Sequence, residues 1–324
     1  MKQPNLSPKS CSRRKLLSVA GLTAAATTCG FSTAITGEAA AQELNYQEQP
    51  ISHWRVGFEL TTPVTCTNVL ATFPVPTEWP EQTVTERQRN VSPQVALAKV
   101  RELGGGTKQM VVQIPRVSAG SKVVCTIDYD IQRAQILPAE NTDTLVIPRR
   151  VSRDLKLYTG NSPFIDASHR AIRSATGEIA KMEAENAWRR VELIYDYVRD
   201  NVEYTEGDLK NASEALVDGT GDCEEMTSLF VAICRNMKIP ARVVWIPDHC
   251  YPEFYLEDAS GNGRWYPCQA AGTRQFGRMD ETRPVLQKGD RFKVPEKRGY
   301  VRYVSEYFRC DRKGRGNPVP NFIR

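Results

Sequence analysis

The sequence predicts an α+β protein, in which a strand-rich region is followed by a helical core that carries further strands. Over residues 54–148, apolar and polar side chains alternate in short runs separated by Gly and Pro, as they do in strands. Helix-forming residues with apolar side chains three and four positions apart follow over 165–202 and again from Cys223. Strand patterns return between residues 242 and 270.

The composition is that of a globular protein with two domains or one large domain. The 324 residues are 40% hydrophobic and 25% charged. The formal charge is +5, but residues 1–41 hold five of the 43 basic and one of the 38 acidic side chains, which leaves 38 against 37. This balance argues against nucleic acid or an anionic membrane as a partner.

Residues 1–41 have the pattern of an export signal. Arg13 and Arg14 precede a short run of small and apolar residues over 19–35, and three alanines end at Ala41. The segment resembles a bacterial twin-arginine signal, which implies export of the folded protein to the periplasm or beyond. A retained membrane anchor is the alternative, but the run is short for a span of about 20 apolar residues. We therefore expect no membrane span once the signal is removed.

Seven cysteines remain after residue 41, an odd number. In an oxidising compartment this favours three disulfides and one free thiol, which would be that of Cys223. The seven residues are Cys66, Cys125, Cys223, Cys234, Cys250, Cys268 and Cys310. A Cys66–Cys125 bond is one candidate, since it would join two predicted strands.

The strand-rich region, residues 42–150, predicts a β-sandwich-like domain. Its first residues, 42–50, form a polar linker, and Gly104–Gly106 marks a turn between strands. The region shows no catalytic pattern, so we expect it to pack or to recognise a partner. His53 lies at its start and His169 lies in the first predicted helix among polar residues, so both are expected at the surface.

A helix is predicted to begin at Cys223. Two glycines precede Asp222, a good N-cap, and Glu225 three residues later completes an acidic capping box. Apolar side chains then follow at helical spacing, Cys234 among them, until Ile239-Pro240 ends the helix. The backbone N–H groups at a helix start favour an anion and lower the pKa of a thiol there. Because nearby carboxylates oppose this effect, Cys223 needs a cationic partner.

His249 is the histidine left to supply that partner. It begins one of three predicted strands after the helix, over 242–246, 249–256 and 265–270. A cysteine at a helix start beside a histidine on a sheet is the arrangement of a thiol acyltransferase. The imidazole takes the thiol proton and later protonates the leaving amine. A third group is needed to hold the imidazole tautomer.

These residues resemble the transglutaminase-like superfamily over roughly residues 155–275. The shared motifs are Gly221-Asp222-Cys223, Cys234-Arg235, Ile239-Pro240-Ala241-Arg242-Val243, His249 with Glu253-Phe254-Tyr255, and Trp265-Tyr266-Pro267. The resemblance implies a papain-like core over residues 151–280, with a Cys-His-Asp site used for transamidation or amide hydrolysis. By position, Cys223 matches the nucleophile and His249 the base.

The third member of the site departs from the family pattern, because Gln269 stands where the family has aspartate. Its carboxamide oxygen can accept the imidazole N–H but stabilises the imidazolium less than a carboxylate does. Asp248 and Glu253 are alternative partners, although Glu253 lies about 13 Å along the same strand. Trp265 is a candidate wall of the substrate cleft.

The strand register tests this assignment. If Gln269 lies opposite His249, then Cys250 lies opposite Cys268 within reach of a disulfide, and the connecting loop is Leu256–Asn262. A tight turn at the end of that loop would instead separate His249 from Gln269. We predict the wide loop.

Residues 281–324 form a basic C-terminal extension, with a partly alternating segment over 300–308 and an expected mobile end from Arg312. The extension is either simply solvated or binds an acidic polymer of the cell envelope.

Two functions remain open. The first is an exported thiol enzyme that acts on peptide or protein amides through a Cys223 thioester, with hydrolysis favoured over transamidation. The second is a catalytically silent binding or scaffold module, with Gln269 as its mark. Neither predicts a cofactor or a metal, and the sequence leaves the oligomeric state and the second oxyanion donor open.

Overall fold

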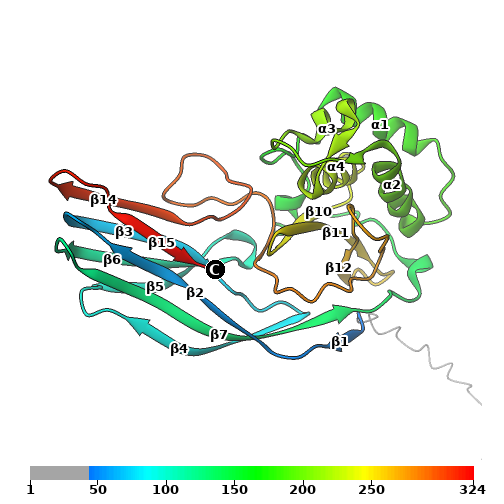
Figure 1. The fold of residues 1–324 in the computed structure, drawn as a ribbon. Coiled ribbons are helices and arrows are strands. Elements are labelled where there is room, and N and C mark those ends of the chain that lie inside the picture. The colour runs from blue at the N-terminus through cyan, green and yellow to red at the C-terminus, as the bar shows by residue number, and fades with distance from the viewer. Residues whose placement is uncertain (1–43) are drawn as a thin grey trace, which may run out of the picture. The chain divides into compact units, whose positions relative to one another are not determined.

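The computed structural model of the protein describes residues 44–324, so the expected export signal lies outside the described residues. Within this part of the chain, two antiparallel sheets are joined to a helical core with its own sheet (Figure 1). No helix of residues 44–324 is long and apolar enough to cross a membrane.

The strand-rich region forms two antiparallel sheets. One has the order β1-β7-β2-β15 with β4 also paired to β7, and the other has the order β14-β3-β6-β5. Their N-terminal strands are β1 (Tyr46–Glu48), β2 (Ser52–Thr61), β3 (Thr65–Val75), β4 (Gln82–Val91), β5 (Leu97–Glu102), β6 (Lys108–Val117) and β7 (Lys122–Ile136). Alternate side chains, such as Phe58 of β2 and Ile127 of β7, are buried in one core cluster that both sheets share.

The C-terminal residues complete both sheets. Strand β14 (Tyr307–Lys313) pairs with β3, and β15 (Val319–Ile323) pairs with β2. The expected mobile end is therefore wrong, since Arg312 pairs with Cys66 of β3. Because these partners lie more than 200 residues earlier in the chain, no local pattern reveals the pairing.

The helices gather around α4. They are α1 (Arg170–Ala180), α2 (Ala187–Asn201), α3 (Ala212–Asp218) and α4 (Cys223–Asn236), with 3-10 turns at Gly104–Gly106, Thr142–Thr144 and Leu155–Tyr158. The side chains of α4 are buried from Glu225 to Arg235, because α1, α2, α3 and the sheet pack around it (Figure 1). A short parallel pair, β8 (Glu203–Tyr204) and β9 (Thr220–Gly221), lies just before α4.

The sheet of the core has the order β12-β11-β10-β13. Its strands are β10 (Ala241–Ile246), β11 (His249–Glu257), β12 (Gly263–Pro267) and β13 (Gln287–Lys288). The predicted register of β11 and β12 is wrong by two residues, because Glu253 pairs with Pro267 and Glu257 with Gly263. The loop is accordingly shorter, and Asp258 N–H donates to the carbonyl of Asn262 across 2.9 Å.

The structure shows none of the predicted disulfides, and all seven cysteines in residues 44–324 are free thiols. Cys250 lies opposite Trp245 on β10 instead of opposite Cys268. Cys66 and Cys125 are on strands of different sheets.

A buried ionic cluster joins the two-sheet region to the core. Lys288 of β13 lies with Nζ 2.6 Å from a carboxylate oxygen of Glu81 and 2.6 Å from one of Glu253. Arg242 also contacts Glu253, at 2.7 Å, and Arg133 lies 3.4 Å from Glu81. Burial alone would raise the pKa of Glu253, but the positive charges of Arg242 and Lys288 hold it at about 2. The carboxylate therefore stays ionised inside the protein.

Candidate active site

The start of α4 is built by the capping box that the sequence predicts. Asp222 accepts a hydrogen bond from Glu224 N–H at 2.7 Å, and Glu225 accepts one from Asp222 N–H at 2.9 Å. Gly221 fits closely before the cap, because a Cβ at this position would lie 2.6 Å from Cβ of Glu225. The cap thus fixes the position from which Cys223 enters the helix.

Cys223 is half-buried and lies beside the side chains of Cys250 and His249. The Cys250 thiol is the largest influence on its pKa and lowers it, burial opposes this, and the His249 imidazole and the Cys250 backbone N–H lower it further. The net pKa of Cys223 is about 5. The thiol is therefore ionised at neutral pH.

His249 opens β11 directly after a tight turn. The turn residue Asp248 has a φ of 56°, so the chain reverses between Ile246 and His249, which pair with each other. Nε2 of its imidazole makes a hydrogen bond with Oε1 of Gln269 at 3.0 Å, and the ring lies beside the Cys223 thiol. Burial lowers the pKa of His249, but the neighbouring Cys223 and Gln269 side chains outweigh it and the net pKa is raised.

Gln269 reaches His249 by leaving the sheet. Strand β12 ends at Pro267, and the N–H of Gln269 then donates to the carbonyl of Gln275 at 2.8 Å. Arg199 of α2 holds the turned chain by donating to the carbonyls of Gln269 and Ala270, each at 3.1 Å. The contact between Gln269 and His249 therefore depends on this turn. It does not require the two residues to lie opposite each other on paired strands.

The alternative partners lie elsewhere. Glu253 is buried between Arg242 and Lys288, and Asp248 lies at the exposed turn. Trp265 packs over Arg242, 4.0 Å from its guanidinium carbon to the ring centre, and is not in the cavity that contains Cys223. The expectation that Trp265 forms a wall of the cleft is wrong, because its side chain packs against Arg242 of the buried ionic cluster.

A cavity of about 860 Å³ contains Cys223 and His249. Its walls include Phe73–Val75 of β3 and Pro76, Trp245–Asp248, Tyr204 of β8, and residues of the C-terminal segment such as Arg302. The sequence predicts no site residues in the two-sheet region or the C-terminal segment. No motif marks these wall residues, because they reach the cavity through the long-range pairing of β3, β14 and β15.

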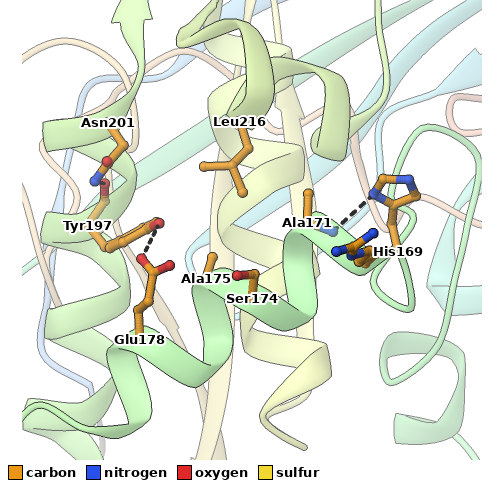
Figure 2. Close-up of a pocket in the computed structure, with 9 residues that line it drawn as sticks. His169, Ala171, Ser174, Ala175, Glu178, Tyr197, Asn201 and Leu216 are labelled. Carbon is orange, nitrogen blue, oxygen red and sulfur yellow. Dashed lines mark hydrogen bonds between the residues drawn. The ribbon is translucent and has the colours of Figure 1, made fainter.

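A second pocket, of about 480 Å³, is lined by residues of α1, α2 and α3 and contains no cysteine (Figure 2). His169 caps α1 there by accepting a hydrogen bond from Ala171 N–H at 3.3 Å, and Tyr197 donates to Glu178 at 3.3 Å. His53 is also at the surface, where it contacts Asp130. Both histidines lie away from Cys223, as expected.

The arrangement supplies the parts of nucleophilic catalysis. Cys223 offers a thiolate, His249 a proton donor and acceptor, and Gln269 an acceptor that orients the ring. Because Nε2 contacts Gln269, Nδ1 is the nitrogen left to exchange a proton with the sulfur.

Comparison with known proteins agrees with this geometry. The protein-family model described as "Transglutaminase-like superfamily" matches residues 173–270, which confirms the resemblance seen in the sequence. A search of curated proteins found no match.

Two solved structures align with this chain. The crystal structure of a "putative cysteine protease" from Cytophaga hutchinsonii aligns with a TM-score of 0.54 and 15% identity, over 86% of this chain and 93% of that chain. A "putative protease" from Parabacteroides distasonis aligns with a TM-score of 0.26 and 12% identity, over 70% of this chain and 48% of that chain. The first similarity shows a shared fold that extends beyond the core, and the second carries no argument.

Proposed function

Since residues 173–270 form a transglutaminase-like domain, we propose that this protein is an exported thiol enzyme that cleaves peptide or protein amides through a Cys223 thioester. The observation that carries the proposal is the position of the His249 imidazole, which lies in one cavity with Cys223 and is hydrogen-bonded to Gln269. A histidine held between a thiolate and an orienting acceptor is the core of a cysteine-dependent acyl-transfer site.

The reaction follows from these positions. The Cys223 thiolate attacks the amide carbon, and the backbone N–H of Cys223 at the helix start is placed to donate to the developing oxyanion. His249 then gives its proton to the leaving amine, which departs as the thioester forms. An acceptor deprotonated by His249 attacks the thioester, and the Cys223 thiolate is released.

Water is the acceptor we favour. The cavity beside Cys223 has a volume of about 860 Å³, with room for many water molecules next to a peptide. A transamidating site must keep water from the thioester, and the polar residues Glu206 and Asp248 on the cavity wall favour its hydration. Hydrolysis is therefore the proposed reaction, with transamidation as the competing one.

The rest of the chain fits an exported enzyme. Residues 1–41 carry the twin-arginine-type pattern, which supports a periplasmic or extracellular location and substrates of the cell envelope. The two-sheet region, interpreted as a β-sandwich domain, would help to bind the substrate, because Phe73 and Pro74 of β3 line the cavity. The C-terminal segment would contribute through Arg302.

A peptide screen tests the proposal. Wild-type protein, Cys223→Ala and the control Cys234→Ala are incubated with a peptide library, and products are identified by mass spectrometry. Cys234 is fully buried in α4 and is not part of the cavity. We expect cleavage by the wild type and the control only. Added amine distinguishes the two reactions, since transamidation leaves the amine in the product.

The silent module has one observation in its favour, the amide of Gln269 in place of an acid. Iodoacetamide labelling separates it from the enzyme. If Cys223 reacts no faster than a free cysteine at neutral pH, and replacing His249 by Ala has no effect, the protein is a binding or scaffold module.

A further inference from the structure

Arg302 forms part of the wall of the cavity that contains Cys223, and the reaction steps proposed above do not use it. Its side chain is only 10% exposed. Among residues 44–324 its buried Nη1 has no hydrogen-bond partner. Because a buried donor without a partner destabilises a fold, the place of this cation calls for an explanation other than stability.

Aromatic rings of the core hold the guanidinium of Arg302 in place. Its carbon lies 5.0 Å from the ring centre of Trp245, in β10, and 5.2 Å from that of Phe164, which precedes α1. The backbone near Arg302 is fixed as well, because Gln287 of β13 and Val304 exchange two hydrogen bonds of 2.9 Å each. Arg302 therefore has a defined position, although it lies outside the helices and strands.

The charged end of Arg302 contacts the first turn of α4. Its Nη2 lies 3.0 Å from a carboxylate oxygen of Glu224, the residue directly after Cys223 in the helix. Burial raises the pKa of Glu224, Arg302 lowers it, and Asp222 and Cys223 raise it. Glu224 thus has negative neighbours on its own helix and a positive one from the C-terminal segment.

We propose that Arg302 is a positioning residue that binds the Glu224 carboxylate and cancels its charge beside the Cys223 sulfur. The proposal rests on the nucleophilic role proposed for Cys223. An unpaired Glu224 would add a negative charge to the turn where the thiolate must form, and like charges disfavour ionisation. With Glu224 paired to Arg302, the backbone N–H groups at the helix start favour the thiolate without opposition from this carboxylate.

Other charged and titratable groups also face Cys223, and the variants that test Arg302 leave them unchanged. They come from α4, β8, β11 with its preceding turn, and the segment before β13. These groups are Asp222, Tyr204, Asp248, His249, Cys250 and Arg283.

Substitutions at both ends of the ion pair separate this role from a structural one. Arg302→Met removes the positive charge, Arg302→Lys restores one, Glu224→Gln removes the negative charge, and the double variant Arg302→Met with Glu224→Gln removes both. Arg291→Met is the matched control. It removes a cation of the same C-terminal segment that packs 4.3 Å from the ring centre of Tyr300, outside the cavity. Thermal unfolding of each variant shows whether it is folded.

The readout is the rate at which iodoacetamide alkylates Cys223, measured from about pH 4 to about pH 9 by mass spectrometry of the peptide that contains it. We expect the midpoint for Arg302→Met to rise by about half a pH unit, which is about threefold less thiolate at acidic pH. Arg302→Lys should lie closer to the wild type. Glu224→Gln should lower the midpoint, because it leaves Arg302 unpaired near the sulfur. The double variant and the control should coincide with the wild type.

Three results would overturn the proposal. The first is a profile of Arg302→Met that coincides with the wild type. The second is a double variant shifted as far as Arg302→Met, because Arg302 would then act on the sulfur without Glu224. The third is an unchanged midpoint in Glu224→Gln, which decides the question even if Arg302→Met does not fold.

His249→Ala separates this result from the function itself. If His249→Ala raises the midpoint and Arg302→Met does not, the nucleophile stands and only the role of Arg302 is wrong. If the wild-type midpoint already lies near that of free cysteine, at about 8.5, and His249→Ala leaves it there, the proposed function fails and takes the role of Arg302 with it.

Discussion

Oε1 of Gln269 lies 3.0 Å from Nε2 of His249, and this contact orients the imidazole so that its other nitrogen is left for Cys223. The acceptor is neutral, so the imidazolium lacks the charge partner that an aspartate would supply. Arg199 fixes the backbone of Gln269 by donating a hydrogen bond to its carbonyl oxygen at 3.1 Å. The strength of the base therefore depends on one amide oxygen held by a turn outside the sheet.

Replacing Gln269 changes that strength in either direction. Gln269→Asp should raise the pKa of His249 further and increase kcat/KM, because a carboxylate stabilises the imidazolium. Gln269→Ala should lower kcat/KM by about tenfold, the equivalent of one lost hydrogen bond to a charged group. Steady-state kinetics on a cleaved peptide measure both. Equal activity of the three proteins would show that Gln269 does not orient the base.

The pH dependence of kcat/KM should be bell-shaped. Because the pKa of Cys223 is lowered to about 5, the rate should rise as pH increases through about 5. Because the pKa of His249 is raised and its proton is needed by the leaving amine, the rate should fall only above the usual imidazole range near about 6.5. The two limbs belong to the interacting pair. If kcat/KM rose only near the pKa of a free thiol, this would contradict an ion pair between the Cys223 thiolate and the His249 imidazolium.

Gly221 should be intolerant of a side chain. In Gly221→Ala the new Cβ would lie 2.6 Å from Cβ of Glu225, so the capping box must shift and Cys223 with it. We expect a loss of about 1 kcal/mol or more in the free energy of unfolding and slower alkylation of Cys223. Gly177→Ala in α1 is the control, since nothing lies within 4 Å of its new Cβ and it should stabilise the helix slightly. Urea unfolding and alkylation rates measure the two effects.

Lys288 should be needed for stability. Lys288→Met removes a cation that lies 2.6 Å from each of two buried carboxylates, Glu81 and Glu253. We expect a loss of about 3 kcal/mol, measured by urea unfolding. Lys122→Ala is the matched control, because its ion pair with Glu59 is exposed and should contribute less than about 1 kcal/mol. Similar losses in the two variants would mean that the buried cluster adds little.

Cys66 is expected to pair with Cys310 under oxidising conditions. Burial and then the neighbouring Cys66 thiol raise the pKa of Cys310 to about 11, and the two residues lie on the paired strands β3 and β14, whereas Cys125 lies on β7 of the other sheet. Peptide mapping without reduction, after treatment with oxidised glutathione, should find the Cys66–Cys310 bond. The Cys66→Ser variant should abolish it. A Cys66–Cys125 bond in its place would contradict this prediction.

Local sequence patterns predict the features that depend on residues close together in the chain. The capping box of Asp222 and Glu225 and the start of α4 at Cys223 follow from spacing along a few residues, and His249 is the remaining histidine at the start of a predicted strand. The signal for a transglutaminase-like core is of the same kind, because its motifs lie within about a hundred residues.

Features that depend on residues far apart in the chain are visible in the folded structure alone. The register of β11 and β12, the turn that carries Gln269 to His249, and the return of β14 and β15 to the first sheets are set by packing between segments far apart in the chain. A slip of two residues keeps every side chain on the same face of a strand, so the alternating pattern cannot distinguish these registers. Cys250 is also placed by the fold alone, because packing of β11 against α4 sets its thiol 3.4 Å from the backbone carbonyl oxygen of Cys223.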